Sequence, residues 1–346
     1  MKSLPASLRL ATLALLLVVL PSCRHSGGRV LEIAYVSGVQ VNLRDRVAAV
    51  YEKAGFVKNG DRVEVLDRDR RFAKVRTATG QIGWVEQRYL VSQQVYDQLQ
   101  KLTADNANDP VQAQGVTRND TNLHVEPGRD TEHLYQISSG EKLAILKRGT
   151  AEKPGTVAAP VHTSSSGEKK EAAPVIEDWW LARDSQGRVG WVLARMVDVD
   201  APLDIAQYAE GQRIVAFFPL NEVQDGDKKV PQYLTILTEP KDGLPFDFNQ
   251  IRVFTWNVKR HRYETAYRER MEGVFPVTVS QENFDKEGVL PVFVVRVLDD
   301  NNAKTSERKY KLNTPIVRRV YAPGEEPAHA TSHKSASKQA SRRHKQ

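Results

Sequence analysis

Residues 39–91 read VQVNLRDRVAAVYEKAGFVKNGDRVEVLDRDRRFAKVRTATGQIGWVEQRYLV, and this stretch decides the fold of the first part of the chain. Apolar and polar side chains alternate in short runs, such as Val63-Glu64-Val65. Short alternating runs between turns rich in glycine and aspartate are typical of antiparallel strands. Several such strands within so few residues predict a small β-barrel.

The same order of features returns later in the chain. Asn42-Leu43-Arg44 corresponds to Asn122-Leu123-His124, which lies 80 residues further on. Gly83-Trp84-Val85 corresponds to Gly190-Trp191-Val192, which lies 107 residues further on. The difference between the two offsets indicates an insertion of 27 residues in the second repeat.

The insertion is visible in the composition of residues 149–176, which read GTAEKPGTVAAPVHTSSSGEKKEAAPVI. This stretch is rich in Ala, Pro, Ser, Gly and Lys and has almost no large apolar side chains. It cannot bury enough apolar surface to offset the entropy lost on ordering. We therefore expect a disordered insertion at about residues 149–176.

Gly60-Asp61 likewise corresponds to Gly140-Glu141. With these features and the Gly-Trp-Val signature, both repeats resemble bacterial SH3-like domains. The first has Phe72 where Trp is usual, and the second has Leu181 where a basic residue is usual. The resemblance implies one SH3-like barrel at residues 32–92 and another at residues 113–200. It also implies binding modules for cell-wall peptides or partner proteins, without catalytic activity. The whole chain is similar to bacterial envelope lipoproteins that carry such domains.

A helical linker is expected at residues 93–112, between the two repeats. Val95, Leu99 and Leu102 share one helical face, and Ser92 suits the N-cap. We expect this short helix to pack on one of the barrels. The alternative is a helix that binds a partner.

Residues 205–322 form a third, β-rich region. Their patterning predicts an antiparallel sandwich or barrel, so the whole chain is expected to be mostly β. Eight strands are expected: Ile214–Leu220, Tyr233–Thr238, Ile251–Val258, Tyr263–Tyr267, Val274–Val279, Val292–Leu298, Glu307–Leu312 and Ile316–Val320. A basic stretch from Arg252 to Arg270 is read as a solvated hairpin or as a contact to an anionic wall polymer or partner.

The first 22 residues predict an exported protein. A basic start is followed by 11 apolar or near-apolar residues up to Leu20, which suits a signal peptide and is too short to span a membrane. Leu20-Pro21-Ser22-Cys23 resembles the lipobox of bacterial lipoproteins. This resemblance implies a signal peptide at residues 1–22 and a lipid on Cys23, which anchors the chain in the membrane. Arg24, in place of Asp, favours the outer membrane facing the periplasm. An ordinary secretory signal is the alternative.

The formal net charge is +7, from 50 Lys+Arg against 43 Asp+Glu. The segment before Cys23 contributes +2 and the residues from His329 onward contribute +5, both without acidic residues. The rest of the chain is neutral, so we expect no nucleic acid as a partner, since binding it requires basic charge on a folded face. Residues 323–346 are expected to form a disordered basic tail. This tail either contacts anionic polymer or lipid head groups or only solubilises the chain.

Several common catalytic motifs are missing from the sequence. A single cysteine excludes an intramolecular disulfide and a cysteine-rich zinc site. No G-x-S-x-G, H-E-x-x-H or P-loop motif occurs, and the eight histidines are scattered. We expect no catalytic residues, no metal and no cofactor.

Four of the five tryptophans lie in the repeats and are the candidate ligand-binding residues: Trp84, Trp179, Trp180 and Trp191. Exposed aromatic rings give large contact area at low entropy cost. The alternative is that the Gly-Trp pairs only pack a barrel end. Strand alternation places Trp179 and Trp180 on opposite faces, so we expect one in the core and the other exposed.

Together these observations favour a lipid-anchored cell-envelope binding protein. Its tandem SH3-like modules would bind peptidoglycan peptide or an envelope protein partner. The first alternative is a scaffolding or assembly lipoprotein that docks an envelope complex through residues 205–322. An enzyme in that region is the second alternative, and no motif points to it.

Overall fold

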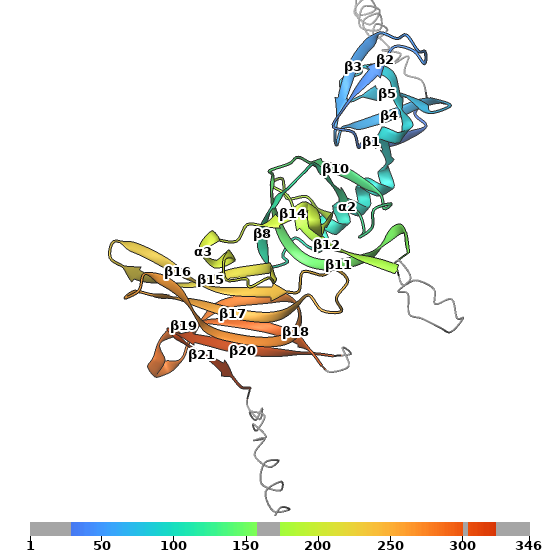
Figure 1. Cartoon of the computed structure of the whole chain (residues 1–346). Helices are drawn as coiled ribbons and strands as arrows, with labels where there is room; N and C mark the ends of the chain where they lie inside the picture. Colours follow the sequence, from blue (N-terminus) through green and yellow to red (C-terminus); the bar gives the residue numbers. More distant parts are fainter. Residues whose placement is uncertain (1–28, 158–173, 300–303, 323–346) are drawn as a thin grey trace, which may run out of the picture. The chain divides into compact units, whose positions relative to one another are not determined.

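The computed structural model describes residues 29–157, 174–299 and 304–322. The chain forms two compact units. One comprises residues up to 36 with residues 40–90, and the other comprises residues 37–39 with everything from 91 onward. Each described unit is rich in antiparallel β-structure, and the described chain contains three seven-stranded sheets (Figure 1). The mostly β fold class predicted from the sequence is confirmed.

The first sheet is built from residues 32–92, coloured blue to teal in Figure 1. Its strands are β1 (Glu32–Val36), β2 (Gln40–Arg44), β3 (Lys53–Lys58), β4 (Arg62–Asp69), β5 (Phe72–Thr77), β6 (Ile82–Glu86) and β7 (Leu90–Ser92). They are ordered β3-β2-β6-β5-β4-β1-β7. Alternate residues point inward and form a valine-rich core that includes Leu43, Val65 and Val85.

The second sheet repeats this order strand for strand, as β10-β9-β13-β12-β11-β8-β14. Its strands are β8 (Ala113–Thr117), β9 (Thr121–His124), β10 (His133–Ile137), β11 (Lys142–Val157), β12 (Pro174–Arg183), β13 (Val189–Leu193) and β14 (Val197–Val199). Short 3-10 turns, η1 (Gln87–Tyr89) and η2 (Ala194–Met196), precede the last strand of each sheet. The correspondence predicted between the two sequence repeats therefore has a counterpart in the strand order.

One glycine in each sheet shows why the repeats share the Gly-Trp pair. A Cβ on Gly83 would lie 2.8 Å from the Leu43 Cβ and 3.2 Å from the Arg44 carbonyl oxygen. A Cβ on Gly190 would lie 2.6 Å from the Leu123 Cβ and 3.3 Å from the His124 carbonyl oxygen. These are corresponding residues, so both sheets need glycine at the same close approach of two strands.

The two ends of the predicted disordered insertion at about 149–176 are strands in the structure, which corrects the prediction there. β11 runs on to Val157 and β12 begins at Pro174, with Gly149 opposite Trp179 and Glu152 opposite Ile176. Composition missed this extension because cross-strand pairing, together with Trp179, orders a segment that has few apolar residues of its own. Residues 158–173 of the predicted insertion lie outside the described residues.

Helix α2 (Gln93–Asp105) lies between the two repeats, as the sequence predicts. The Ser92 hydroxyl accepts a hydrogen bond from the Val95 N–H at 3.4 Å and caps the helix. Val95 and Leu99 are buried, so the apolar stripe packs inward. The helix lies against β10 and β13 of the second sheet.

The third sheet follows a short helix, α3 (Leu203–Ala206). Its strands are β15 (Arg213–Asp225), β16 (Lys228–Thr238), β17 (Phe248–Asn257), β18 (Arg262–Asn283), β19 (Val289–Leu298), β20 (Thr305–Asn313) and β21 (Ile316–Val320), with the 3-10 turn η3 (Asp285–Glu287). The strands are antiparallel neighbours in chain order.

This sheet has seven described strands where the sequence predicts eight, because β18 covers two of the predicted ones. The charged run between them resembles a turn in the sequence. In the structure Arg268 pairs with Arg252 and Arg270 pairs with Gln250, and beyond a register shift the strand stays paired through Gly273 and Phe248. The exposed charged side chains of this run lie on a strand that remains paired with β17.

Candidate ligand-binding surface

The outward side of β2, β5 and β6 is the candidate binding surface of the first unit, and we call it the first outer face. Leu43 and Val85 point into the core, so their neighbours Arg44, Trp84 and Glu86 point outward. Arg44 stands opposite Trp84, and Lys74 of β5 stands opposite Trp84 on the other side. The first outer face consists of Asn42, Arg44, Tyr51, Phe56, Leu66, Phe72, Lys74, Ile82, Trp84 and Glu86.

Arg44 organises one end of this face. Its guanidinium carbon lies 4.2 Å from the centre of the Tyr51 ring and 4.9 Å from that of Phe72. The guanidinium also forms an ion pair with Glu86 at 3.1 Å. Two ring contacts and a carboxylate hold the arginine in one orientation, a geometry that suits recognition of a carboxylate-bearing ligand.

Apolar side chains on the first outer face remain open to solvent. Phe56 is 46% exposed and Ile82 is 43% exposed, while Trp84 is half-buried. The Lys53 and Lys58 ammonium groups lie 5.4 Å and 5.8 Å from the centre of the Phe56 ring. The face thus combines aromatic contact area with basic charge, as peptide-binding surfaces do.

The corresponding side of the second sheet, which we call the second outer face, has different properties. His124 takes the position of Arg44 and stands opposite Trp191 in the ladder. Its ring lies 5.2 Å from that of Trp179 and 5.0 Å from that of His133, and its Nδ1 is 3.1 Å from the Thr131 carbonyl oxygen. Burial, together with the charge of His133, lowers the pKa of His124 to about 4. The histidine is therefore neutral at physiological pH.

Helix α2 covers the second outer face. Leu102 packs against a buried cluster of Leu146, Leu181 and Val189, and Trp191 packs against the same cluster. The Thr103 hydroxyl accepts a hydrogen bond from the Val189 N–H at 3.0 Å. This side of the second sheet is part of a core in the folded chain.

The four candidate tryptophans are accordingly not equivalent. Trp84 and Trp191 are half-buried. Trp179 and Trp180 are 2% and 3% exposed, so the expectation that one of this pair is exposed is wrong. Alternation does place them on opposite sides of β12, but both sides are covered. Trp179 lies under His124, and Trp180 lines a groove of about 660 Å³ that Leu203 and Ile214 also line.

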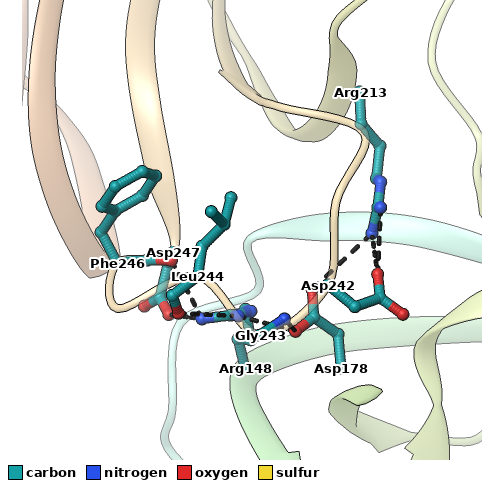
Figure 2. A network of polar contacts seen from close by, with 8 residues as sticks. All are labelled: Arg148, Asp178, Arg213, Asp242, Gly243, Leu244, Phe246 and Asp247. Carbon is teal, nitrogen blue, oxygen red and sulfur yellow. Dashed lines mark hydrogen bonds and ion pairs between the residues drawn. The ribbon is translucent and has the colours of Figure 1, made fainter. Parts of the chain in front are cut away.

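Figure 2 shows the polar network that holds β11 and β12 against residues 242–247. The buried Arg148 donates to Asp178 at 2.6 Å, to the Leu244 carbonyl oxygen at 3.0 Å and to the Phe246 carbonyl oxygen at 2.9 Å. Asp178 also accepts from the Gly243 N–H at 3.0 Å. These contacts tie the second sheet to the loop before β17, which explains why this sheet offers little free surface.

The network brings two arginines, Arg148 and Arg213, together with three aspartates, Asp178, Asp242 and Asp247. Burial disfavours the charged form of Arg148, but the hydrogen bonds and charges of Asp178 and Asp247 outweigh this effect, so the pKa of Arg148 is raised and the guanidinium stays charged. Burial raises the pKa of Asp247, which accepts from the Phe275 N–H at 2.7 Å and pairs with Arg148 at 3.3 Å. Arg213 completes the network by pairing with Asp242 at 3.0 Å.

The basic stretch of the third region divides into two parts. On the hairpin between β17 and β18, the exposed Arg260 and Arg262 pair with Glu264. By contrast, Arg252 is buried and shares Glu210 with Arg268. The hairpin part is solvated, in agreement with the simpler of the two interpretations.

Sequence reasoning singled out tryptophans and missed most of the first outer face. Arg44, Tyr51 and Phe72 meet only in the folded sheet. Phe72 is the one residue of this group that the sequence could have indicated, because it stands where the resembling family usually has Trp. The predicted lipidation residue, Cys23, lies outside the described residues. In the ranges that the structure covers, no group of three or more His, Cys, Asp or Glu side chains is arranged to hold a metal. No helix in those ranges is long and apolar enough to cross a bilayer.

The sheet that bears the first outer face can be assigned to a family. Residues 38–91 match the bacterial SH3 domain. This match confirms the family resemblance of the first repeat, which we call the SH3 domain from here on. No curated protein matches the chain.

Solved structures similar to the chain include NlpC2 and NlpC1 from Trichomonas vaginalis and an NlpC/P60 family protein from Bacillus cereus. Their sequence identities to this chain are 13%, 8% and 12%, and their TM-scores are 0.16, 0.17 and 0.22. The matches cover 52%, 69% and 84% of this chain, and 54%, 88% and 100% of the respective structures. The chain thus spans about half the length of NlpC2. TM-scores this low support no conclusion about fold or activity.

Proposed function

We propose that the protein is a cell-envelope binding protein whose SH3 domain binds a peptide ligand through the first outer face. The ligand belongs to the cell wall or to an envelope protein. One observation carries the proposal. The SH3 domain leaves Phe56 and Ile82 exposed on the face that also carries Arg44 and the half-buried Trp84, whereas the second sheet fills the same side with α2. Binding is thereby assigned to the first repeat and not to both.

The proposal treats the chain as a binding protein and not as an enzyme. What the first outer face offers is contact area and charge, supplied by aromatic rings, an oriented guanidinium and lysines. These groups recognise a peptide with carboxylates without acting on it chemically.

We also propose that the protein is exported and anchored by a lipid on Cys23, in the outer membrane facing the periplasm. The support is the signal-like segment before Cys23 and the absence of Asp at position 24. Membrane fractionation of a Cys23→Ser variant tests the anchor. The variant is expected in the soluble fraction, and its retention in the membrane would contradict lipid anchoring.

The binding surface is tested by sedimentation of the full chain with purified peptidoglycan and by retention on solubilised envelope proteins. Phe56→Ala is expected to weaken retention about tenfold on whichever fraction holds the ligand, since truncating an exposed aromatic contact removes binding area. Gln136→Ala is the matched control, because Gln136 stands opposite Asn122 as Phe56 stands opposite Asn42. Equal retention of both variants on both fractions would contradict the proposal.

A further inference from the structure

The two outer faces are formed by corresponding strands in the same order, which we call the shared frame. The second sheet shows which kind of element can pack on this frame. In the second sheet the occupant is α2, whose Leu102 packs on Leu146, Leu181 and Val189. An amphipathic helix is therefore a ligand that this side of the sheet is shaped to receive. The corresponding side of the SH3 domain has the same frame, and residues 40–90 contain no α-helix of their own to fill it.

The SH3 domain retains most of the apolar residues that α2 contacts. Leu66 corresponds to Leu146, and both stand at the same irregularity of the ladder, between Val65 and Asp67 in one sheet and between Ile145 and Lys147 in the other. Ile82 corresponds to Val189, and Trp84 corresponds to Trp191. Val189 is fully buried beneath the helix, whereas Ile82 is 43% exposed.

One position differs in chemical kind. Lys74 stands opposite Trp84 where Leu181 stands opposite Trp191. Lys74 forms no ion pair with any residue of the described chain. An ammonium group in the middle of an apolar patch favours an occupant that brings a carboxylate to it.

The net charge of the two repeats differs in the same direction as Lys74 and Leu181, with the first repeat more basic. Residues 29–91 hold 12 Lys+Arg against 8 Asp+Glu, a net charge of +4. Residues 92–200 hold 12 Lys+Arg against 16 Asp+Glu, a net charge of −4. The net charge of zero between the signal segment and the tail is therefore the sum of a basic SH3 domain, an acidic second repeat and the third region. Opposite charge on a partner speeds and orients its encounter with the SH3 domain.

We propose that the first outer face binds an acidic amphipathic helix of a protein partner, seated on the SH3 domain as α2 is seated on the second sheet. The inference rests on the proposed function, because it names the ligand of the same surface. The helix inserts a leucine-like side chain between Leu66, Ile82 and Trp84. A carboxylate next to that side chain pairs with Lys74.

Two labelled peptides test the proposal by fluorescence anisotropy with the full chain at low salt. The first has the sequence of residues 92–106, and the second is its acidic counterpart, equal in shape. The acidic peptide carries Gln93→Glu, Gln94→Glu, Gln98→Glu and Gln100→Glu. It is expected to bind at least tenfold more tightly than the first. In a Lys74→Leu chain this preference is expected to disappear, because the variant recreates the apolar second outer face.

A charge placed on the patch localises the binding. Ile82→Asp is expected to weaken the acidic peptide at least tenfold, while Leu31→Asp, at a 57% exposed leucine outside the first outer face, leaves binding unchanged. Equal effects of these two variants, or equal affinity of the two peptides, would overturn the proposal.

Sedimentation with peptidoglycan separates this proposal from the proposed function. A chain that binds peptidoglycan through Phe56 but neither peptide refutes the helix and retains the binding protein. A chain that binds the acidic peptide through Ile82 but not peptidoglycan supports the helix and excludes the wall as the ligand. A chain that binds none of them refutes both.

Discussion

The first and second sheets have the same strand order, yet the outer face of one is a surface and that of the other belongs to a core. The SH3 domain exposes Ile82 and Phe56 and carries Lys74 at the centre of its face. The second sheet buries Leu181 and Val189 under α2 and closes over Trp179. The comparison teaches that the backbone frame does not decide whether this side binds a ligand. The side chains at a few outward positions do.

The largest expected difference between the two sheets is at Arg148 and Arg68, which occupy corresponding positions. Arg148→Ala leaves Asp247 without its cation and Asp178 with only Arg213, at 3.7 Å, and is expected to cost about 3–5 kcal/mol of unfolding free energy. Arg68→Ala removes an exposed pair with Glu32 and is expected to cost less than about 1 kcal/mol. Urea denaturation of the full chain, followed by tryptophan fluorescence, measures both. Similar losses of unfolding free energy in both variants would show that the Arg148 network contributes little to holding the second sheet against residues 242–247.

Exchanging the residues at the centre of each face gives the next largest effect. Leu181→Lys places an ammonium group beneath α2 and is expected to lower stability by about 3 kcal/mol, through lost apolar burial and desolvation of the charge. Lys74→Leu is expected to change stability by less than about 0.5 kcal/mol, because that position is partly open. A stable Leu181→Lys protein would mean that α2 does not form a tight cover.

The pH dependence of stability distinguishes His124 from its counterpart Arg44. The pKa of His124 is lowered to about 4 from 6.5, so the unfolded chain binds a proton in this range that the folded chain does not. Unfolding free energy is therefore expected to fall by up to about 3 kcal/mol between pH 6.5 and pH 4, at about 1.4 kcal/mol per pKa unit. His124→Asn should flatten this slope, and denaturation at several pH values measures it. An unchanged slope in the variant would place the titration elsewhere.

The smallest expected effect tests whether α2 covers the second outer face. Ser92→Ala removes the N-cap hydrogen bond to the Val95 N–H and is expected to destabilise the helix by about 1 kcal/mol. Hydrogen exchange is expected to quicken in α2 and at the Val189 amide, which bonds to Thr103. The amides of β5 and β6 in the SH3 domain serve as the internal control. Faster exchange in both sheets would indicate general destabilisation and not a loosened cover.

Much of the architecture follows from local patterns. The repeats, the glycines at the close approach and the capped helix were predictable because each depends on neighbouring residues or on a fixed spacing. The extension of β11 and the continuity of β18 were not, since pairing with distant strands overrides a polar composition. The burial of both Trp179 and Trp180 was missed for a related reason. Alternation assigns faces to a strand but does not say what covers them.

The sequence by itself determined the β class and the match of residues 38–91 to an SH3 domain, and it predicted the shared strand order of two sheets, because strand periodicity and close-packed glycines depend on local sequence. Only the tertiary structure decided which repeat presents a free face. That outcome depends on where α2 lies and on the Arg148 network, which join segments nearly 100 residues apart. Burial is a property of the assembled chain. Corresponding side chains such as Ile82 and Val189 are therefore exposed in one repeat and buried in the other.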